Sequence, residues 1–288
     1  MKFAFIESEK ANYPIAALCE DLDVSRAGFY AWRGRPESKR ATEDRSLFVH
    51  VQAAFDAGRR CYGSPRVHRE LQAQRLVIGR KRVMRLMRAG GLRARVIRRY
   101  RCTTMSDHDQ PIAPNLLDRN FQPAVQNQSW ASDTTELVTG SGKLYLAAVL
   151  DLYSRFVVGW AVSAVNDRHL VIKALDMALR RRCPGAGLLH HSDQGSPYAS
   201  EDYQRVLAAH GIACSMSRRG NCYDNAVAES WFKTVKAELG SRFNNHGHAK
   251  DELFDYIEVF YNQQRRHSAL DYVSPAEYER AARVRQAA

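Results

Sequence analysis

Acidic residues stand at positions where their neighbours predict regular secondary structure. Asp133 lies inside SWASDTTELV, a run rich in β-forming residues in which an acid is unfavourable by propensity. Asp193 follows the short apolar run 188–190 and precedes a polar turn in HHSDQGSPYAS. An aspartate in such a turn often only hydrogen-bonds its own backbone, so its position alone leaves a structural role open.

The strand pattern predicts that the two aspartates meet. With a period of two residues, Asp133 and Glu136 point to opposite faces of a strand, so Glu136 is excluded from the same site. If the strand before Asp193 lies beside the first strand and parallel to it, both aspartates reach the same edge of the sheet. Open α/β sheets bind their ligands at that edge.

A third acid comes from the amphipathic helix NAVAESWFKTVKAELG. Its polar stripe, opposite the apolar arc, consists of Asn225, Glu229, Lys233 and Lys236. Pairing of Glu229 with Lys233 across one helical turn would explain the stripe without any site. The conjunction with the two aspartates favours a shared site instead.

Three adjacent carboxylates are costly because each raises the pKa of the others, unless cations neutralise them. Hard oxygen ligands of this kind suit Mg²⁺ or Mn²⁺. Two such ions about 4 Å apart can activate a water or a 3′-hydroxyl and stabilise the leaving oxygen during in-line attack at a phosphodiester. We therefore predict two ions held by Asp133, Asp193 and Glu229.

The net charge of +12 is concentrated near the start of the chain. Residues 1–106 contain 23 Lys and Arg against 10 Asp and Glu, whereas residues 107–288 contain 20 against 21. This density favours a surface that neutralises the phosphates of nucleic acid. A membrane surface is disfavoured, because no amphipathic helix combines these charges with a broad apolar face.

Two helical units are predicted in the basic region. In the first, Pro14 begins one helix and Ser25 caps a second, RAGFYAWR, in a helix-turn-helix pattern. In the second, Ser64 begins one helix and Gly79 precedes another, GRKRVMRLMRAGGL. The outward basic residues of the latter, predicted to contact DNA, are Arg80, Lys81, Arg82, Arg85 and Arg88. An ordinary small helical bundle fits the same pattern.

The remaining chain predicts a mixed sheet covered by helices. After the polar stretch 102–127, typical of a linker, come three β-rich runs, 129–138, 143–151 and 155–163, and then helices alternating with short apolar runs. No apolar run could span a bilayer and no signal peptide is evident, so we expect a cytoplasmic, nucleoid-associated protein without membrane contact. The six cysteines form no CxxC pair and no His pair stands near them, which argues against a zinc site.

These motifs resemble those of the D,D(35)E transposases of bacterial insertion sequences, OrfB type, in the retroviral-integrase superfamily. Asp193 and Glu229 are separated by 35 residues, and WASDTTEL and NAVAESWFKTVKAEL surround the other acids. The further motifs occur in family order over nearly the whole chain: SRAGFYAW, YGSPRVHREL, GRKRVMRLMRAGGL, APNLLDRNF, LDLYSRFVVGW, HSDQGSPYAS, RRGNCYDNAVAES and YNQQRRHSALDYVSPAEYE.

The resemblance implies an α/β fold, with an RNase H-like mixed five-stranded sheet flanked by helices and an all-α N-terminal region containing a helix-turn-helix. The corresponding parts are a DNA-binding region (1–101), a linker (102–127), the catalytic core (128–240) and C-terminal helices that complete it (241–288). The three acids would bind metal and drive cleavage of DNA at element ends and its joining to target DNA.

Partners also follow from the resemblance. Joining two element ends implies a dimer or higher oligomer on DNA, and an upstream reading-frame product could supply a further helix-turn-helix and coiled coil. The chain lacks the His-His-Cys-Cys module of retroviral integrases, so no structural zinc is expected. Further DNA contacts are predicted at Lys233, Lys236, Arg265 and Arg266. Ordinary surface charge fits these four residues too.

Competing residues and functions remain at this stage. Asp151 ends a predicted strand, and Asp224 is expected to cap the helix of Glu229. Asn225 and His191 could position the acids or touch DNA. An RNase H-like nuclease or resolvase that hydrolyses without joining fits the same fold, as does a DNA-binding regulator with an inactive core.

Overall fold

The structure is a computed structural model that describes residues 1–95, 110–240 and 242–287. It consists of two compact units, residues 1–52 and 53–288. The boundary between these units falls within helix α4 (Lys39–Ala57).

Part of the predicted linker, residues 102–109, lies outside the described residues. Among the described residues, no helix is both long and apolar enough to cross a membrane.

Three short helices form the smaller unit together with the first part of α4. They are α1 (Lys2–Glu9), α2 (Ile15–Asp21) and α3 (Arg26–Arg33). Their buried core consists of Ile6, Leu18, Cys19 and Phe29. Ser25 caps α3 as predicted, because its Oγ accepts a hydrogen bond of 3.0 Å from the N–H of Gly28.

A mixed sheet with the strand order β3-β2-β1-β4-β5 forms the centre of the larger unit. The strands are β1 (Ser129–Thr139), β2 (Gly142–Asp151), β3 (Val157–Ser163), β4 (Leu189–Ser192) and β5 (Ala213–Met216). The first three pair antiparallel, whereas β4 is parallel to β1 and to β5. This arrangement confirms the predicted mixed sheet. A sixth, unpredicted strand, β6 (Arg242–Phe243), pairs parallel with the end of β1.

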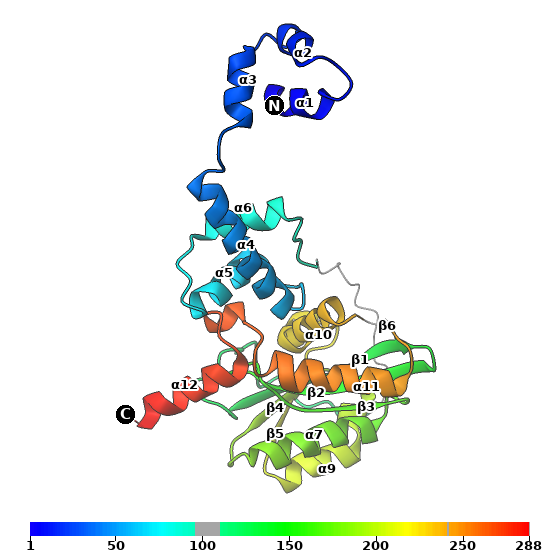
Figure 1. Ribbon diagram of the computed structural model, residues 1–288. Coiled ribbons are helices and arrows are strands. Elements are labelled where there is room, and N and C mark those ends of the chain that lie inside the picture. The colour runs from blue at the N-terminus through cyan, green and yellow to red at the C-terminus, as the bar shows by residue number, and fades with distance from the viewer. Residues whose placement is uncertain (96–109, 241, 288) are drawn as a thin grey trace. The chain divides into compact units, whose positions relative to one another are not determined.

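Helices cover both faces of this sheet (Figure 1). They are α7 (Arg168–Arg182), α8 (Ser196–Ala199), α9 (Glu201–Ala209), α10 (Ala226–Glu238), α11 (His246–Phe254), which continues as a π-helix (Asp255–Tyr261), and α12 (Pro275–Ala287). Trp130 packs with Leu175 and Leu207 from α7 and α9 on one face. On the other face, Ala131 packs with Ala228 of α10. Successive residues of β1 thus face different helical layers.

The helices α5 (Ser64–Ala73) and α6 (Arg80–Ala89) belong to the larger unit. Contacts with the C-terminal part of the chain explain this assignment. The backbone N–H of Arg266 donates to Tyr62 Oη at 2.7 Å, and the Arg266 side chain donates to Glu70 at 2.6 Å. The predicted helix starts at Ser64 and after Gly79 are confirmed.

Candidate active site

Asp133 and Asp193 lie at a point where one edge of β1 is open. Ala131 of β1 pairs with His191 of β4, so each aspartate stands two positions beyond a paired residue. Strand β4 ends one residue before Asp193, and β6 joins β1 only from Val138 onward. Between these points, no described strand runs along this edge of β1. The parallel pairing predicted from the sequence therefore brings the two aspartates to one opening in the sheet.

The backbone fixes one oxygen of each aspartate. The N–H of Thr134 donates to Asp133 Oδ1 at 2.7 Å, and the N–H of Gly195 donates to Asp193 Oδ1 at 3.0 Å. A β-carbon at position 195 would lie only 2.9 Å from that oxygen. Glycine at this position therefore allows the turn to close on the carboxylate.

Helix α10, which carries Glu229, covers the face of the sheet toward which Ala131 points, and Asp133 points to that face too. Asn225, which is buried, donates from Nδ2 to the backbone oxygen of Ser132 at 3.1 Å and so ties the start of α10 to β1. Lys233 donates from Nζ to Glu229 Oε2 at 3.3 Å. The pairing of Glu229 with Lys233 that the sequence suggested is therefore present. Glu229 lies one helical turn after Asn225, which binds β1.

Electrostatics connects the three acids. Burial and then the nearby Asp193 carboxylate raise the pKa of Asp133 well above its usual range, and Glu229 raises it further. The N–H of Thr134 and the ammonium of Lys236 oppose this rise only in part. Repulsion of this kind is the condition under which bound cations stabilise a carboxylate cluster.

The acids do not yet converge as metal ligands. In residues 1–95, 110–240 and 242–287, no three His, Cys, Asp or Glu side chains are arranged to hold one ion. This agrees with the electrostatic coupling, because repulsion acts well beyond a Mg²⁺–oxygen bond of about 2.1 Å. Glu229 is engaged by Lys233 in this arrangement. In their chemistry, the oxygens of three carboxylates are donors of the kind that hard cations prefer.

Two buried histidines support the strand that leads to Asp193. Burial lowers the pKa of His190 to about 3 and that of His191 to about 4, so both are neutral near pH 7. His190 Nε2 lies 2.8 Å from Ser132 Oγ of β1, and His191 Nδ1 lies 2.9 Å from Ser215 Oγ of β5. The pair therefore links β4 to both neighbouring strands through hydrogen bonds.

The prediction that Asp224 caps α10 is wrong. This residue lies in the 3-10 turn Cys222–Asn225 and is fully buried. Its carboxylate accepts hydrogen bonds of 2.8 Å from both Arg218 and Arg119. Hydrogen bonding, above all from Arg218, holds the pKa of Asp224 well below its usual range. The ion pairs fasten the segment before β1 to the loop that leads into α10.

Family comparisons cover most of the chain. A sequence model described as an HTH-like domain matches residues 42–100. Two models described as Integrase core domain match residues 123–222 and 210–275. The second and third ranges contain all three acids.

Close relatives decide the family. The "Insertion element IS600 uncharacterized 31 kDa protein" of Shigella sonnei is 43% identical over 263 residues, which are 91% of this chain and 97% of that protein. "Transposase InsF for insertion sequence IS3A" of Escherichia coli (strain K12) is 40% identical over 284 residues, 97% of this chain and 98% of that protein. The chain belongs to the insertion-sequence transposases.

Among solved structures, the HTLV-2 integrase catalytic core domain in complex with magnesium covers 55% of the transposase and 99% of its own chain, at 15% identity and a TM-score of 0.43.

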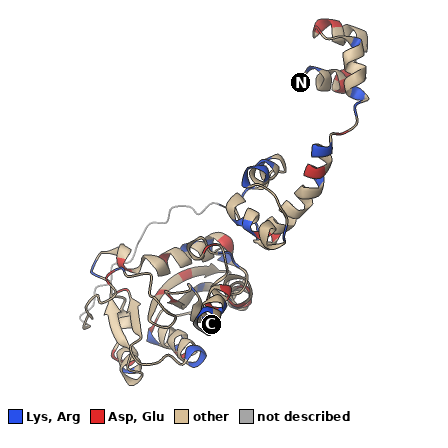
Figure 2. Ribbon diagram, turned by 90° about the vertical axis from the view of Figure 1, so that its left-hand side faces the viewer, with Lys and Arg blue, Asp and Glu red and all other residues tan. Residues whose placement is uncertain are grey.

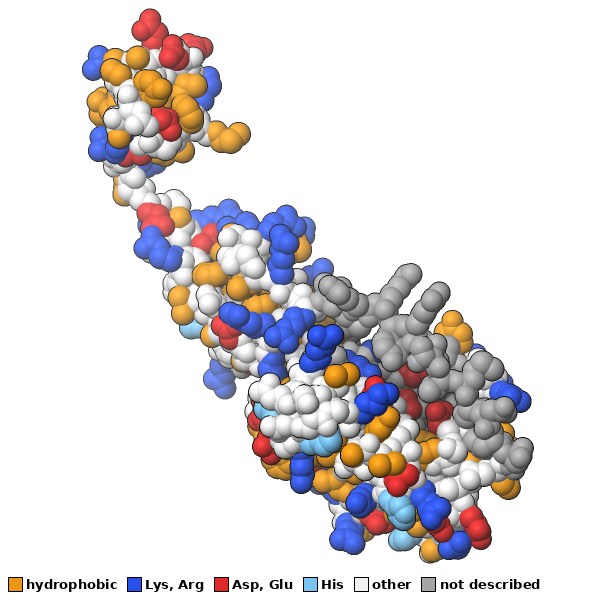
Figure 3. Space-filling view, turned by 90° about the vertical axis from the view of Figure 1, so that its right-hand side faces the viewer, with side chains coloured by type: hydrophobic (Ala, Val, Ile, Leu, Met, Phe, Trp, Pro, Cys, Tyr) orange, Lys and Arg blue, Asp and Glu red, His pale blue; other side chains and the backbone are white. Residues whose placement is uncertain are grey.

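Four of the five basic residues that were predicted to face outward on α6 are exposed in the transposase. Helix α6 buries Val83, Leu86 and Met87 on its inner side. Arg82 is half-buried, and the exposed basic residues are Arg80, Lys81, Arg85 and Arg88. Lys and Arg residues are frequent along the ribbon of the helical region that contains α6 (Figure 2), and their side chains are frequent on its surface (Figure 3). Their exposure is compatible with phosphate contacts, which remain a prediction.

Arg265, predicted from the sequence to contact DNA, lies in the interior of the protein. Arg265 is 3% exposed, and its guanidinium donates two hydrogen bonds to Glu238. Arg266 is half-buried and engaged by Glu70 and by the backbone oxygen of Tyr272 at 2.9 Å. The sequence indicates only that Glu238 needs a buried partner, because it lies off the polar stripe of its helix, and it does not say which residue that partner is.

Proposed function

We propose that this transposase cleaves DNA strands at the ends of an insertion sequence and joins them to target DNA, with Asp133, Asp193 and Glu229 as its metal-binding acids. The observation that carries the proposal is the parallel pairing of β1 with β4, which brings Asp133 and Asp193 to one opening in the sheet, on the face that the helix of Glu229 covers. The raised pKa of Asp133, caused by burial and by the carboxylates of Asp193 and Glu229, supports it. A cluster of acids whose charges oppose one another fits a site that binds cations.

The donor set supports a hard divalent cation, Mg²⁺ or Mn²⁺, and two ions accommodate a phosphoryl transfer best. Bound ions of this class supply Lewis-acid activation of the attacking hydroxyl and stabilisation of the leaving oxygen. The Thr134 and Gly195 N–H groups keep one oxygen of each aspartate oriented. Asn225 holds the start of α10 against β1, so Glu229 needs only a side-chain rotation to leave Lys233.

DNA phosphates require a cationic surface, and two parts of the transposase supply one. Lys233 and Lys236 share the half-buried polar stripe of α10 with Glu229, so we infer contacts with phosphates near the cleaved bond. The basic face of α6 supports binding of longer DNA. Joining two element ends requires at least two copies on DNA, and the product of an upstream reading frame is a further candidate partner.

The test is a strand cleavage and joining assay with labelled element ends and Mg²⁺ or Mn²⁺. Asp193→Asn removes the charge with little change of shape, and Asp251→Asn makes the same change at an exposed position of α11. Joined products from the wild type and from Asp251→Asn, absent with Asp193→Asn although its DNA affinity is retained, are the expected result.

Other outcomes separate the remaining candidates. Equal joining by both variants would remove Asp193 from the site. Cleaved but never joined strands would favour a nuclease or resolvase. DNA binding without cleavage by the wild type, with or without an upstream product, would favour a regulator with an inactive core.

A further inference from the structure

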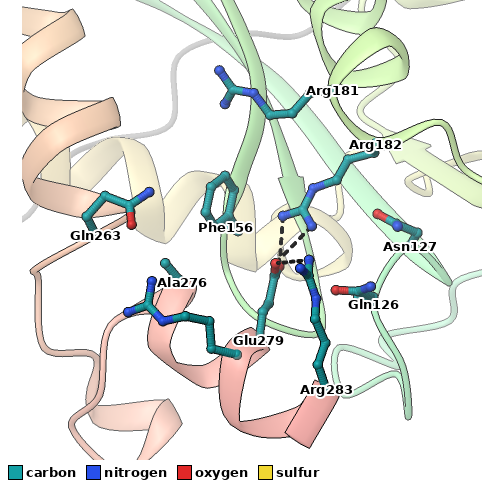
Figure 4. A pocket seen from close by; sticks show the side chains of 10 residues that line it. Gln126, Asn127, Phe156, Arg181, Arg182, Gln263, Ala276, Glu279 and Arg283 are labelled. Atoms are coloured by element: carbon teal, nitrogen blue, oxygen red, sulfur yellow. Dashed lines mark hydrogen bonds and ion pairs between the residues drawn. The ribbon is translucent and has the colours of Figure 1, made fainter. Parts of the chain in front are cut away.

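An arginine-lined cavity of about 450 Å³ lies apart from the acids, between the end of α7, helix α12 and the segment that precedes β1 (Figure 4). Asn127 lines it from that segment, two residues before β1 begins. Asp133 lies four residues beyond Ser129, the first residue of β1, which is about 13 Å along the strand at about 3.3 Å per residue. Lining residues and acids are therefore different sets at different positions along β1.

The charge of the cavity is strongly positive. Four arginines and one glutamate line it: Arg181, Arg182, Arg280, Arg283 and Glu279. Arg181 also donates to Glu258 at 2.8 Å, so these six side chains carry a net charge of two positive units. Arg182 binds Glu279 with two hydrogen bonds of 2.8 Å, and Ser154 Oγ donates to the same carboxylate at 2.6 Å. Both side chains of this ion pair are nearly buried, with 8% and 6% of their area exposed. Arg182 and Ser154 therefore make the short contacts of this carboxylate.

Several donors remain available to a ligand. Arg283 reaches Glu279 only at 4.0 Å and is 63% exposed, and Arg280 makes no ion pair with any described residue. Arg182 Nε, on a side chain more than nine-tenths buried, has no hydrogen-bond partner. The side-chain oxygen of Asn127 is also buried without a partner, and a 180° turn of this amide would present N–H groups instead. A buried guanidinium donor left unpaired favours an anionic ligand.

We propose that this cavity binds a phosphate group of the DNA backbone, as a DNA subsite distinct from that at the acids. Guanidinium groups match phosphate oxygens in geometry and charge. Exposed arginines from α12 stand at the rim, so a continuous polymer can pass while one phosphate enters. The inference rests on the proposed function, because DNA is the polyanion that the transposase handles.

The test is DNA binding of the full chain without divalent ions, so that no strand chemistry is required. Arg280→Ala combined with Arg283→Ala removes two cations at the rim. Arg168→Ala combined with Arg205→Ala removes two exposed arginines elsewhere and is the matched control. Fluorescence anisotropy with a labelled duplex over a series of salt concentrations gives the affinity and its salt dependence.

The cavity variant is expected to lower affinity at 0.1 M salt on the order of tenfold, and to make the slope of log K against log salt shallower by about 0.9, the value for one lost phosphate contact. Arg280→Lys with Arg283→Lys is expected to restore most of the slope, because the charges return. Thermal unfolding should be unchanged in all three variants, since the replaced residues are exposed.

Three results would overturn the inference. Identical slopes for the cavity variant, the control and the wild type would remove this subsite while leaving the proposed function intact. No DNA binding by the wild type would remove both. Calorimetric binding of pyrophosphate that is lost in the cavity variant, with unchanged DNA slopes, would assign the cavity to a small phosphate ligand instead.

Discussion

Arg265 and Glu238 form a two-pronged ion pair in the interior of the larger unit. Arg265 Nε and Nη2 donate to the two carboxylate oxygens of Glu238 at 2.7 and 2.6 Å. Tyr256 Oη donates to the same carboxylate at 2.8 Å, and Arg95 donates to the backbone oxygen of Glu238 at 2.9 Å. The pair therefore connects the end of α10 with the C-terminal segment and with the segment after α6.

Breaking this pair is expected to destabilise the transposase by about 3–5 kcal/mol, because one buried charge loses its partner. Arg265→Met keeps the volume of the side chain and leaves Glu238 unpaired. Urea unfolding measures the loss, and the double variant with Glu238→Leu should recover much of it. A loss below about 1 kcal/mol in the single variant would contradict the buried pair. Because Arg265 is buried, the salt slope of DNA binding should not change.

Lys233→Met tests whether Lys233 contacts a DNA phosphate in addition to its hydrogen bond with Glu229. One lost phosphate contact makes the salt slope of end-DNA binding shallower by about 0.9. The free energy of unfolding should change by less than about 0.5 kcal/mol, since a partly exposed pair one turn apart contributes little. Lys250→Met, on the exposed surface of α11, is the matched control. Equal slopes for both variants would leave Lys233 as a partner of Glu229 alone.

Asn225→Ala tests the tie between α10 and β1. Loss of the 3.1 Å hydrogen bond to the Ser132 oxygen should destabilise the fold by about 1–3 kcal/mol. We also expect slower strand joining at unchanged DNA affinity, because Glu229 loses its fixed position relative to Asp133. Single-turnover joining at saturating DNA, well below the unfolding temperature, separates the two effects. A normal joining rate in a destabilised variant would assign Asn225 a structural role only.

Asp151→Asn tests a pH dependence that does not involve the acid cluster. Asp151 is fully buried, and burial raises its pKa to about 6, although the N–H groups of Asn127 and Tyr153 donate to it at 2.8 and 2.9 Å. The unfolded chain ionises near pH 4, so the native state binds more protons between pH 4 and 6. The contribution of Asp151 to stability is therefore present at low pH and lost as pH rises to about 6.

The variant carries no charge at position 151, so it does not lose this stability as the pH rises. The unfolding free energy of the variant minus that of the wild type should therefore increase by up to about 3 kcal/mol between pH 4 and 7. Urea unfolding at both values measures the difference, with Asp251→Asn as an exposed control. A constant difference between wild type and variant would contradict the raised pKa.

Local patterns predicted most of the elements. Ser25 caps α3 because its side chain acts within one helical turn, and β1 and α10 follow from periods of two and 3.6 residues. The parallel pairing that aligns Asp133 with Asp193 followed from the order of strands and helices. Strand β6 escaped prediction because two residues carry no period.

Burial of individual charges could not be predicted in this way. Arg265 and Arg266 occur in one polar run, yet Arg265 is buried because it pairs with Glu238. The two partners are 27 positions apart in the sequence, so no local pattern connects them. Asp224 seemed suited to a helix cap by position, but Arg119, 105 residues away, holds it in a buried ion pair. Such pairs depend on distances in space that no sequence pattern contains.

The amino-acid sequence by itself determined the order of helices and strands, the transposase family and the three carboxylates proposed to act together, because periodicity, capping and motif spacing are local properties. Only the tertiary structure decided which charges face solvent, that Glu229 is paired with Lys233, and that arginines from α7 and α12 line one cavity. These relationships arise when distant segments pack, since ion pairs and cavities are formed by neighbours in space.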